Sequence, residues 1–163
     1  MTEIDELSAR VGEACRRAGL TVATAESCTG GGVAEAVTRT AGSSAWFDRG
    51  FIAYANAAKV DLLGVRQETL GTHGAVSEAV AREMALGALH QSDADLAVAV
   101  TGVAGPGGGT ATKPVGLVWF AWASLGGTVE SRFEIFGGDR AAVRGQAVRE
   151  ALKGLLDLAS REG

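Results

Sequence analysis

Two short segments of this sequence carry side chains that can exchange a proton. In the first, Ser27, Cys28 and Thr29 stand directly before a run of glycines, where a strand gives way to a helix. In the second, the phenol of Tyr54 is followed by the amine of Lys59. The chain has only three lysines, and Lys59 stands in an otherwise apolar stretch. A phenol or a neutral amine can take the proton of a serine hydroxyl without histidine or metal, so these segments predict a nucleophilic serine.

The two nucleophile candidates also fit structural roles. Ser27 could instead be a helix N-cap, a position at which serine is a preferred residue. Cys28 is the rival nucleophile, because a thiol beside a helix N-terminus can have a lowered pKa, but cysteine is also a common core residue. Neighbouring side chains on a strand face opposite sides, so Ser27 and Cys28 are not expected to face the same cleft.

The two proton acceptors have ordinary alternatives as well. Lys59 acts as a base only where burial or positive neighbours lower its pKa, and it is otherwise a solvated lysine. Tyr54 ends an apolar strand and could be a buried phenol with a satisfied hydroxyl.

Anion-binding groups are expected in three places. Backbone N–H groups of Thr29, Gly30 and Gly31 stand at a helix start, where they could bind an oxyanion or a phosphate. The glycine-rich loop over residues 101–109 matches neither the P-loop nor the dinucleotide fingerprint, so it predicts a phosphate site or a tight turn. Arg140 could clamp an anion or be a surface arginine. The candidate positions in the loop are Thr101, Gly102, Gly105 and Gly108.

The composition limits the class of protein. A length of 163 residues, with 47% hydrophobic and 21% charged residues, predicts one soluble domain over residues 1–163. The formal net charge of −4 and the lack of a basic cluster argue against a nucleic-acid partner. The acidic start and the absence of an apolar run of about 20 residues predict a cytoplasmic protein without a membrane partner.

Metal and cofactor binding are not expected. The chain has two cysteines and two histidines, and neither pair has the close spacing of zinc sites. These residues are Cys15, Cys28, His73 and His90. With no export signal, both thiols are expected to be reduced.

The elements that position these residues follow from hydrophobic periodicity. Helices are predicted over residues 4–18, 33–37, 59–63, 76–89 and 139–159. Strands are predicted over residues 20–25, 46–55, 96–101, 115–125 and 128–136. This order predicts an α/β fold, a three-layer α/β/α sandwich with a mixed, mostly parallel sheet and one antiparallel strand near the C-terminus. Ser27, Tyr54 and the loop over residues 102–109 then meet at the carboxyl edge of the sheet, where ligands bind.

Several segments form a recognisable set. They read TAESCTGG, AGSSAWFDRGFIAYANAAK, LGVRQETL followed by HGAVSE, TGVAGPGGG, KPVGLVWFA and GDR. Together, from about residue 5 to residue 160, they resemble the CinA carboxyl-terminal domain family, in its PncC-type nicotinamide mononucleotide amidohydrolase form. One departure is Gly107, where relatives often carry an aspartate.

The resemblance implies a function. Such proteins hydrolyse the carboxamide of nicotinamide mononucleotide to nicotinic acid mononucleotide and ammonia, in pyridine-nucleotide salvage. It also implies a metal-independent serine amidase without a cofactor, with catalytic roles on Ser27, Lys59 and Tyr54, and a homodimer. The longer CinA proteins carry a further molybdopterin-binding-like domain, so the chain resembles the stand-alone form or an excised domain. Two alternatives stay open: a serine-lysine amidase or esterase of other specificity, and a non-catalytic nucleotide-binding module.

Overall fold

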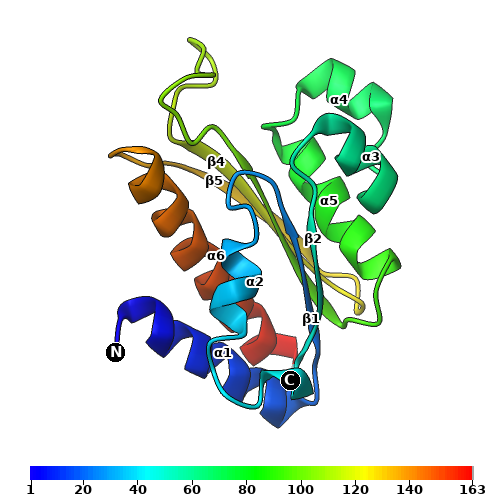
Figure 1. Cartoon of the computed structure of the whole chain (residues 1–163). Helices are drawn as coiled ribbons and strands as arrows, with labels where there is room; N and C mark the ends of the chain where they lie inside the picture. Colours follow the sequence, from blue (N-terminus) through cyan, green and yellow to red (C-terminus); the bar gives the residue numbers. More distant parts are fainter. Residues whose placement is uncertain (163) are drawn as a thin grey trace.

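A five-stranded β-sheet lies between two layers of helices in the computed structural model of this chain, which describes residues 1–162 (Figure 1). The helices are α1 (Glu3–Ala18), α2 (Gly32–Val37), α3 (Asn56–Leu63), α4 (Gln67–His73), α5 (Glu78–His90) and α6 (Arg140–Glu162), with a 3-10 turn η1 (Ser43–Ala45). The strands are β1 (Val22–Glu26), β2 (Phe47–Ile52), β3 (Leu96–Gly102), β4 (Leu117–Ser124) and β5 (Val129–Ile135). All the expected elements are present, and α4 and η1 are additions. Within residues 1–162, no helix is both long and apolar enough to cross a membrane.

The sheet is mixed, with the strand order β2-β1-β3-β4-β5. β1 pairs in parallel with β2 and β3, whereas β4 pairs antiparallel with β3 and β5. β4 alone therefore runs against the other strands, as expected. The prediction of a mostly parallel sheet was inaccurate in its pairing, because β4 lies between two strands and makes half of the strand pairs antiparallel.

The helices divide between the two faces of the sheet, which confirms the α/β class with three layers. α1, α2 and α6 cover one face, and α5 covers the other with α3 and α4 packed against it (Figure 1). The carboxyl ends of β1 and β3 lie side by side, because these two strands are parallel neighbours. The segments that follow them therefore meet at one edge, as expected for a ligand site.

The two faces of the sheet carry side chains of different size. The inner strands place alanine on the face toward α5, at Ala23, Ala25, Ala97, Ala99, Ala121 and Ala123. The opposite face carries large side chains that pack against α1, α2 and α6, at Val22, Leu96, Val98, Val100, Val118, Phe120 and Trp122. Small side chains under α5 leave room for that helix to lie close to the sheet, whereas the opposite layer is held off by bulky groups.

Helix boundaries follow local signals. Gly19 ends α1 in the left-handed conformation, with φ of 69°, which glycine adopts without strain. The Ser77 hydroxyl accepts the N–H of Val80 at the start of α5. The Asp139 carboxylate accepts the N–H of Ala142 and so caps α6. Each of these three residues lies within one position of a helix end predicted from the sequence.

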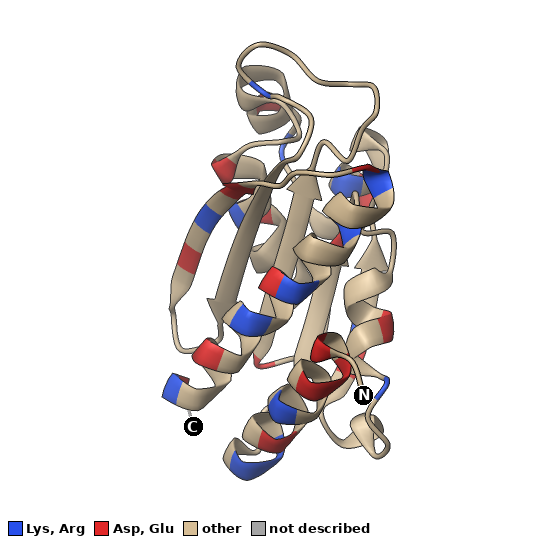
Figure 2. Cartoon of the chain, turned by 90° about the vertical axis from the view of Figure 1, so that its left-hand side faces the viewer, with Lys and Arg blue, Asp and Glu red and all other residues tan. Residues whose placement is uncertain are grey.

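Positively and negatively charged residues are interspersed along α1 and α6 (Figure 2). Arg149 of α6 pairs with Glu3 of α1 at 3.2 Å and with Glu150 at 3.5 Å. Such partly exposed pairs contribute about 1 kcal/mol or less each, so the packing of α1 on α6 rests mainly on the apolar core.

Candidate active site

Ser27 and Lys59 meet at the carboxyl end of β1. Ser27 follows the last residue of β1, and its N–H continues the sheet by donating to the carbonyl of Val100 at 3.0 Å. Its hydroxyl faces α3, whose first turn carries Lys59. The Lys59 Nζ and Ser27 Oγ atoms are 3.3 Å apart, which is within hydrogen-bonding reach. A serine and an amine 32 residues apart in sequence are thus brought into direct contact.

The amine of Lys59 is held out of water. Lys59 is 1% exposed, and its Nζ also contacts the carbonyl oxygen of Tyr54 at 2.8 Å. Burial lowers the pKa of this amine below its usual 10.5, while the neighbouring Cys28 works in the opposite direction. A lowered pKa raises the fraction of neutral amine at neutral pH, which is the form that can accept a proton.

The phenol of Tyr54 points elsewhere. Its side chain is exposed, and its hydroxyl accepts from Arg140 Nη2 at 3.2 Å. Arg140 Nη1 also donates to the carbonyl of Gly105 at 2.8 Å. Within residues 1–162 the Tyr54 hydroxyl has no hydrogen bond to Ser27 or Lys59. The amine therefore reaches the serine directly, without the phenol as an intermediate.

Cys28 does not share this environment. Its side chain lies in the core on the other face of the sheet, as strand alternation predicts. Burial raises the pKa of its thiol to about 11, although the positive charges of Arg144 and Arg140 oppose this. A thiol with that pKa is protonated at neutral pH and is a poor nucleophile. The position and the pKa of Cys28 therefore favour Ser27 as the candidate nucleophile.

The turn after Ser27 is organised by the carboxylate of Glu26, which is 1% exposed. This carboxylate accepts hydrogen bonds from one hydroxyl and three backbone N–H groups. The donors are Thr29 Oγ1 at 2.6 Å, Gly31 N at 3.2 Å, Val33 N at 2.8 Å and Ala34 N at 3.0 Å. A buried carboxylate at a helix N-terminus is stabilised by such donors, and here it also fixes the chain around Ser27.

The free donors of this turn differ from those expected. The N–H of Gly30 donates to the carbonyl of Ser27 at 3.1 Å, and the N–H of Gly31 is bound by Glu26. In the described part of the chain, the N–H groups of Cys28 and Thr29 have no backbone or side-chain acceptor. An oxyanion beside Ser27 would therefore meet Cys28 and Thr29 rather than the two glycines.

The glycine-rich loop reaches the site at one point. The Thr101 hydroxyl donates to the carbonyl of Ala75, so it already has a partner. A Cβ on Gly102 would lie 2.7 Å from a Val118 methyl, so glycine at this position serves close packing. Gly105 contacts the site through Arg140. Gly108 lies in the exposed tip of the loop, with φ of 86°.

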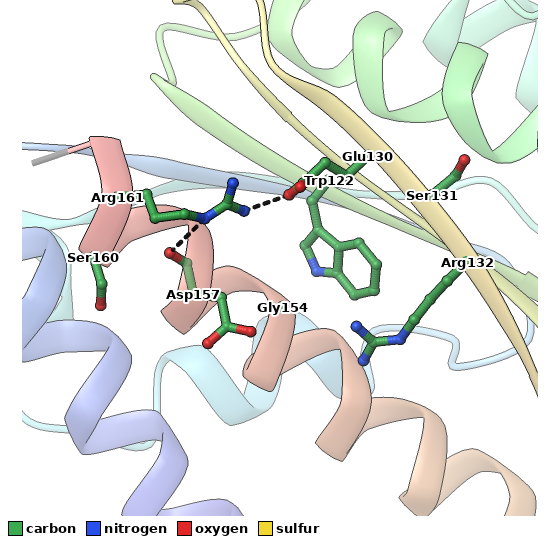
Figure 3. Close-up of a pocket in the computed structure, with 8 residues that line it drawn as sticks. All are labelled: Trp122, Glu130, Ser131, Arg132, Gly154, Asp157, Ser160 and Arg161. Carbon is green, nitrogen blue, oxygen red and sulfur yellow. Dashed lines mark hydrogen bonds and ion pairs between the residues drawn. The ribbon is translucent and has the colours of Figure 1, made fainter.

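Two cavities of the structure can be compared with the candidate site. One lies beside Arg140, and the other lies away from Ser27 and Lys59. One, of about 480 Å³, opens between the loop and the start of α6 and is lined by Pro106, Val115 and Arg140 among others. Another, of about 570 Å³, lies between β5 and the last turns of α6, on Trp122 (Figure 3). In Figure 3, Arg161 pairs with Glu130 and with the backbone of Asp157, and no predicted site residue lines this second cavity. The Arg161 side chain that lines this cavity is thus already paired.

No metal site accompanies the serine. Across residues 1–162, no three side chains of histidine, cysteine, aspartate or glutamate gather closely enough to hold an ion. Sequence reasoning missed two residues of the site, Glu26 and Arg144. Arg144 donates to the carbonyls of Cys28 and Thr29 at 3.1 and 3.3 Å. It stands one helical turn after Arg140, and this spacing is a signal that could have revealed it.

The fold and the site define a class: an α/β/α sandwich with a serine and a buried lysine at the carboxyl edge of its sheet. The family model of the CinA C-terminal domain matches residues 4–159, and the chain belongs to this family. The resemblance predicted from the motifs is therefore confirmed.

Similar proteins are known from several bacteria. The chain is 56% identical to the nicotinamide-nucleotide amidohydrolase PncC of Escherichia coli K12, over 94% of this chain and 93% of the relative. It is 54% identical to a protein of the same name from Pseudomonas putida, over 97% and 98% of the two chains. The crystal structure of the competence/damage inducible protein CihA from Agrobacterium tumefaciens superimposes with a TM-score of 0.95, at 52% identity, over 97% and 96% of the chains.

Proposed function

We propose that this chain is an amidohydrolase that converts nicotinamide mononucleotide to nicotinic acid mononucleotide and ammonia in pyridine-nucleotide salvage. The observation that carries the proposal is the 3.3 Å contact between Ser27 Oγ and the buried amine of Lys59. Support comes also from relatives that are more than half identical over nearly the full chain and bear the name of this activity.

The reaction proceeds by acyl transfer to Ser27. Neutral Lys59 takes the hydroxyl proton as Ser27 Oγ attacks the carboxamide carbon. The N–H groups of Cys28 and Thr29 stabilise the tetrahedral oxyanion, each contributing about 3 kcal/mol. Protonated Lys59 gives its proton to the leaving nitrogen as the C–N bond breaks, and ammonia departs. Water then attacks the acyl-enzyme as Lys59 takes a proton from it. The bond between the acyl carbon and Ser27 Oγ breaks, Lys59 returns the proton to Oγ, and the carboxylic acid departs.

The nucleotide phosphate binds at Arg140 and at backbone N–H groups of the loop over residues 102–109. Arg140 now donates to two neutral oxygens, of Gly105 and Tyr54. Phosphate oxygens form stronger, charge-assisted hydrogen bonds with a guanidinium, so they can displace these partners. Tyr54 would then be free to turn toward the substrate, where its phenol assists proton transfer. This arrangement favours the nucleotide over free nicotinamide.

The protein acts as a cytoplasmic homodimer without metal or other cofactor. Apolar side chains exposed on the edge strand β5, Phe133 at 51% and Ile135 at 59%, are of the kind that a subunit interface covers. Light scattering at micromolar concentration tests the dimer, and a monomer mass would contradict it.

Ammonia release from nicotinamide mononucleotide tests the function. Turnover should far exceed that of nicotinamide, glutamine and simple esters, and should survive chelation. Ser27→Ala should abolish it without unfolding the protein, whereas Cys28→Ala should retain most of it. Nucleotide binding without ammonia release would favour a binding module, and equal turnover of other amides would favour a broader amidase. Loss of turnover on chelation would exclude the metal-free scheme.

A further inference from the structure

The guanidinium of Arg144 holds the backbone of the Ser27 turn from the side of α6. In Figure 1, α2 and the turn before it lie against α6. Arg144 Nε donates to the carbonyl of Cys28 at 3.1 Å, and its Nη2 donates to the carbonyl of Thr29 at 3.3 Å. One rigid fork thus binds two successive peptide groups, which a single ammonium could not do with the same geometry.

These contacts fix the direction of an N–H group in the site. In a planar trans peptide the C=O and N–H bonds point in opposite directions. The carbonyl of Cys28 shares its peptide with the N–H of Thr29. Because Arg144 draws that carbonyl toward α6, the Thr29 N–H points away from α6, to the side of the sheet where Ser27 and Lys59 lie. Arg144 therefore sets the aim of an oxyanion donor without contacting substrate.

The second peptide completes the turn. The carbonyl of Thr29 shares its peptide with the N–H of Gly30, which donates to the carbonyl of Ser27. Gly30 has φ of 56°, and a Cβ there would lie 3.4 Å from Arg144 Nη2. Glycine at this position thus permits both the turn and the close approach of the guanidinium.

Arg144 differs in its partners from Arg149, which lies on the same helix. Within residues 1–162 it forms no ion pair with a carboxylate, whereas Arg149 pairs with Glu3 and Glu150. Its guanidinium donates instead to two backbone carbonyls of the turn after Ser27, which lie 115 and 116 residues earlier in the chain. An arginine that served only to attach α6 would not need both of these carbonyls.

We propose that Arg144 is a positioning residue of the amidase. It holds the Cys28–Thr29 peptide so that the Thr29 N–H meets the oxyanion formed on Ser27. The proposal rests on the proposed function, since the oxyanion exists only if amide hydrolysis takes place. It adds a residue that acts through the backbone and not through contact with the substrate.

Kinetics of Arg144→Gln and Arg144→Lys test this role, with Arg149→Gln as the matched control on the same helix. Misalignment of one oxyanion donor should lower kcat about 100-fold, with KM within about 3-fold of wild type, because only the transition state needs the donor. Arg144→Lys keeps the charge but not the fork and should also lose most of kcat. Arg149→Gln should retain wild-type kinetics.

Chemical rescue separates positioning from folding. Guanidinium chloride at sub-denaturing concentration should restore part of kcat to Arg144→Gln, whereas sodium chloride at equal ionic strength should not. Thermal unfolding and circular dichroism establish that each variant is folded before it is assayed. If Arg144→Gln does not fold, the kcat of Arg144→Lys tests the proposal instead.

The outcomes are distinguishable. If the wild type releases no ammonia, the proposed function fails and the positioning role fails with it. If the wild type is active and both Arg144 variants keep kcat, only the positioning role is overturned. An increase in KM at unchanged kcat would instead show that Arg144 binds substrate, and that too would overturn it.

Discussion

The amine of Lys59 contacts two neutral oxygens, Ser27 Oγ and the Tyr54 carbonyl, and in the described chain it has no carboxylate partner. Removing a charged amine from water without a counter-charge is costly, so its neutral form is favoured. Burial therefore makes this lysine a base, and it also lowers the free energy of unfolding of the protein. Two predictions follow from this residue, one on rate and one on stability.

The rate of ammonia release should depend on the protonation of Lys59. The base must be neutral, so kcat/KM should rise with pH along a limb that reports the pKa of Lys59 in the free enzyme. Because burial lowers that pKa, the limb should lie below 10.5. The measurement is kcat/KM between about pH 6 and about pH 10, with Lys153→Arg, a change at a partly exposed lysine, as the control. A limb at or above 10.5 would contradict a buried base.

Replacement of Lys59 by methionine should abolish turnover but stabilise the fold at neutral pH. Methionine fills a similar volume and has no charge to desolvate. The folded pKa of Lys59 is below its unfolded value of 10.5, so the unfolded chain binds more protons between these values and wild-type stability rises with pH there. The advantage of Lys59→Met should therefore be largest below the folded pKa and shrink toward pH 10.5. Urea unfolding measures it, and lower stability of Lys59→Met at neutral pH would contradict the expectation.

At the scale of elements, local signals were sufficient for most of the fold. Caps at Gly19, Ser77 and Asp139 and the apolar periods of the strands were readable, because each depends on neighbours in sequence. The helix α4 was not, since its seven residues are mostly polar, include Gly71 and show no apolar period. The position of β4 between β3 and β5 was also not predicted, because the place of a hairpin in a sheet depends on distant strands.

The candidate site was likewise predictable from the sequence only in part. The contact of Ser27 with Lys59 could be expected, because both follow strands that end at one edge of the sheet. The donors of the turn could not be assigned, since Glu26 takes the N–H of Gly31 and this depends on how the chain folds back. The spacing of Arg144 from Arg140 could mark it as a site residue, but the carbonyls it binds lie more than one hundred residues away and could not be named from the sequence.

Glu26 links β1 to α2, and its removal should loosen both. In Glu26→Gln an amide NH₂ group would face backbone donors, so buried N–H groups would lose their acceptor. The free energy of unfolding should fall by about 1–3 kcal/mol, and kcat should fall with it. Glu35→Gln, an exposed change on α2, should cost about 0.5 kcal/mol or less. Urea unfolding of both variants gives the comparison, and equal stability of the two would contradict this role of Glu26.

Two glycines of α6 should respond oppositely to alanine. A Cβ on Gly154 would lie 2.0 Å from the Trp122 ring, so Gly154→Ala forces the ring to move and should cost about 1–3 kcal/mol. A Cβ on Gly145 meets nothing within 4 Å, so Gly145→Ala should stabilise by up to about 1 kcal/mol through helix propensity. Thermal unfolding of both variants decides this, and a shift of the same sign in each would count against it.

At the scale of the whole molecule, the site joins segments that follow β1, β2 and β3 with the start of α6. A nucleotide bound across them should stabilise the entire fold. In Ser27→Ala, which cannot turn it over, nicotinamide mononucleotide at about 100 times its Kd should add about 2.7 kcal/mol of stability. Free nicotinamide at equal concentration should add less, because it lacks the phosphate, and Arg140→Gln should reduce this difference. Equal shifts for both ligands would argue against a phosphate site at Arg140.

The unequal faces of the sheet restrict how this enzyme could be redesigned for bulkier amides. Space in an enzyme is commonly gained by shortening a side chain, but at the six buried alanines under α5 the inner strands already end at a methyl group. New volume there would require displacing the helix itself. Shortening Val100 or Phe120, on the opposite face, is another route, and it would weaken the same core that supports α6.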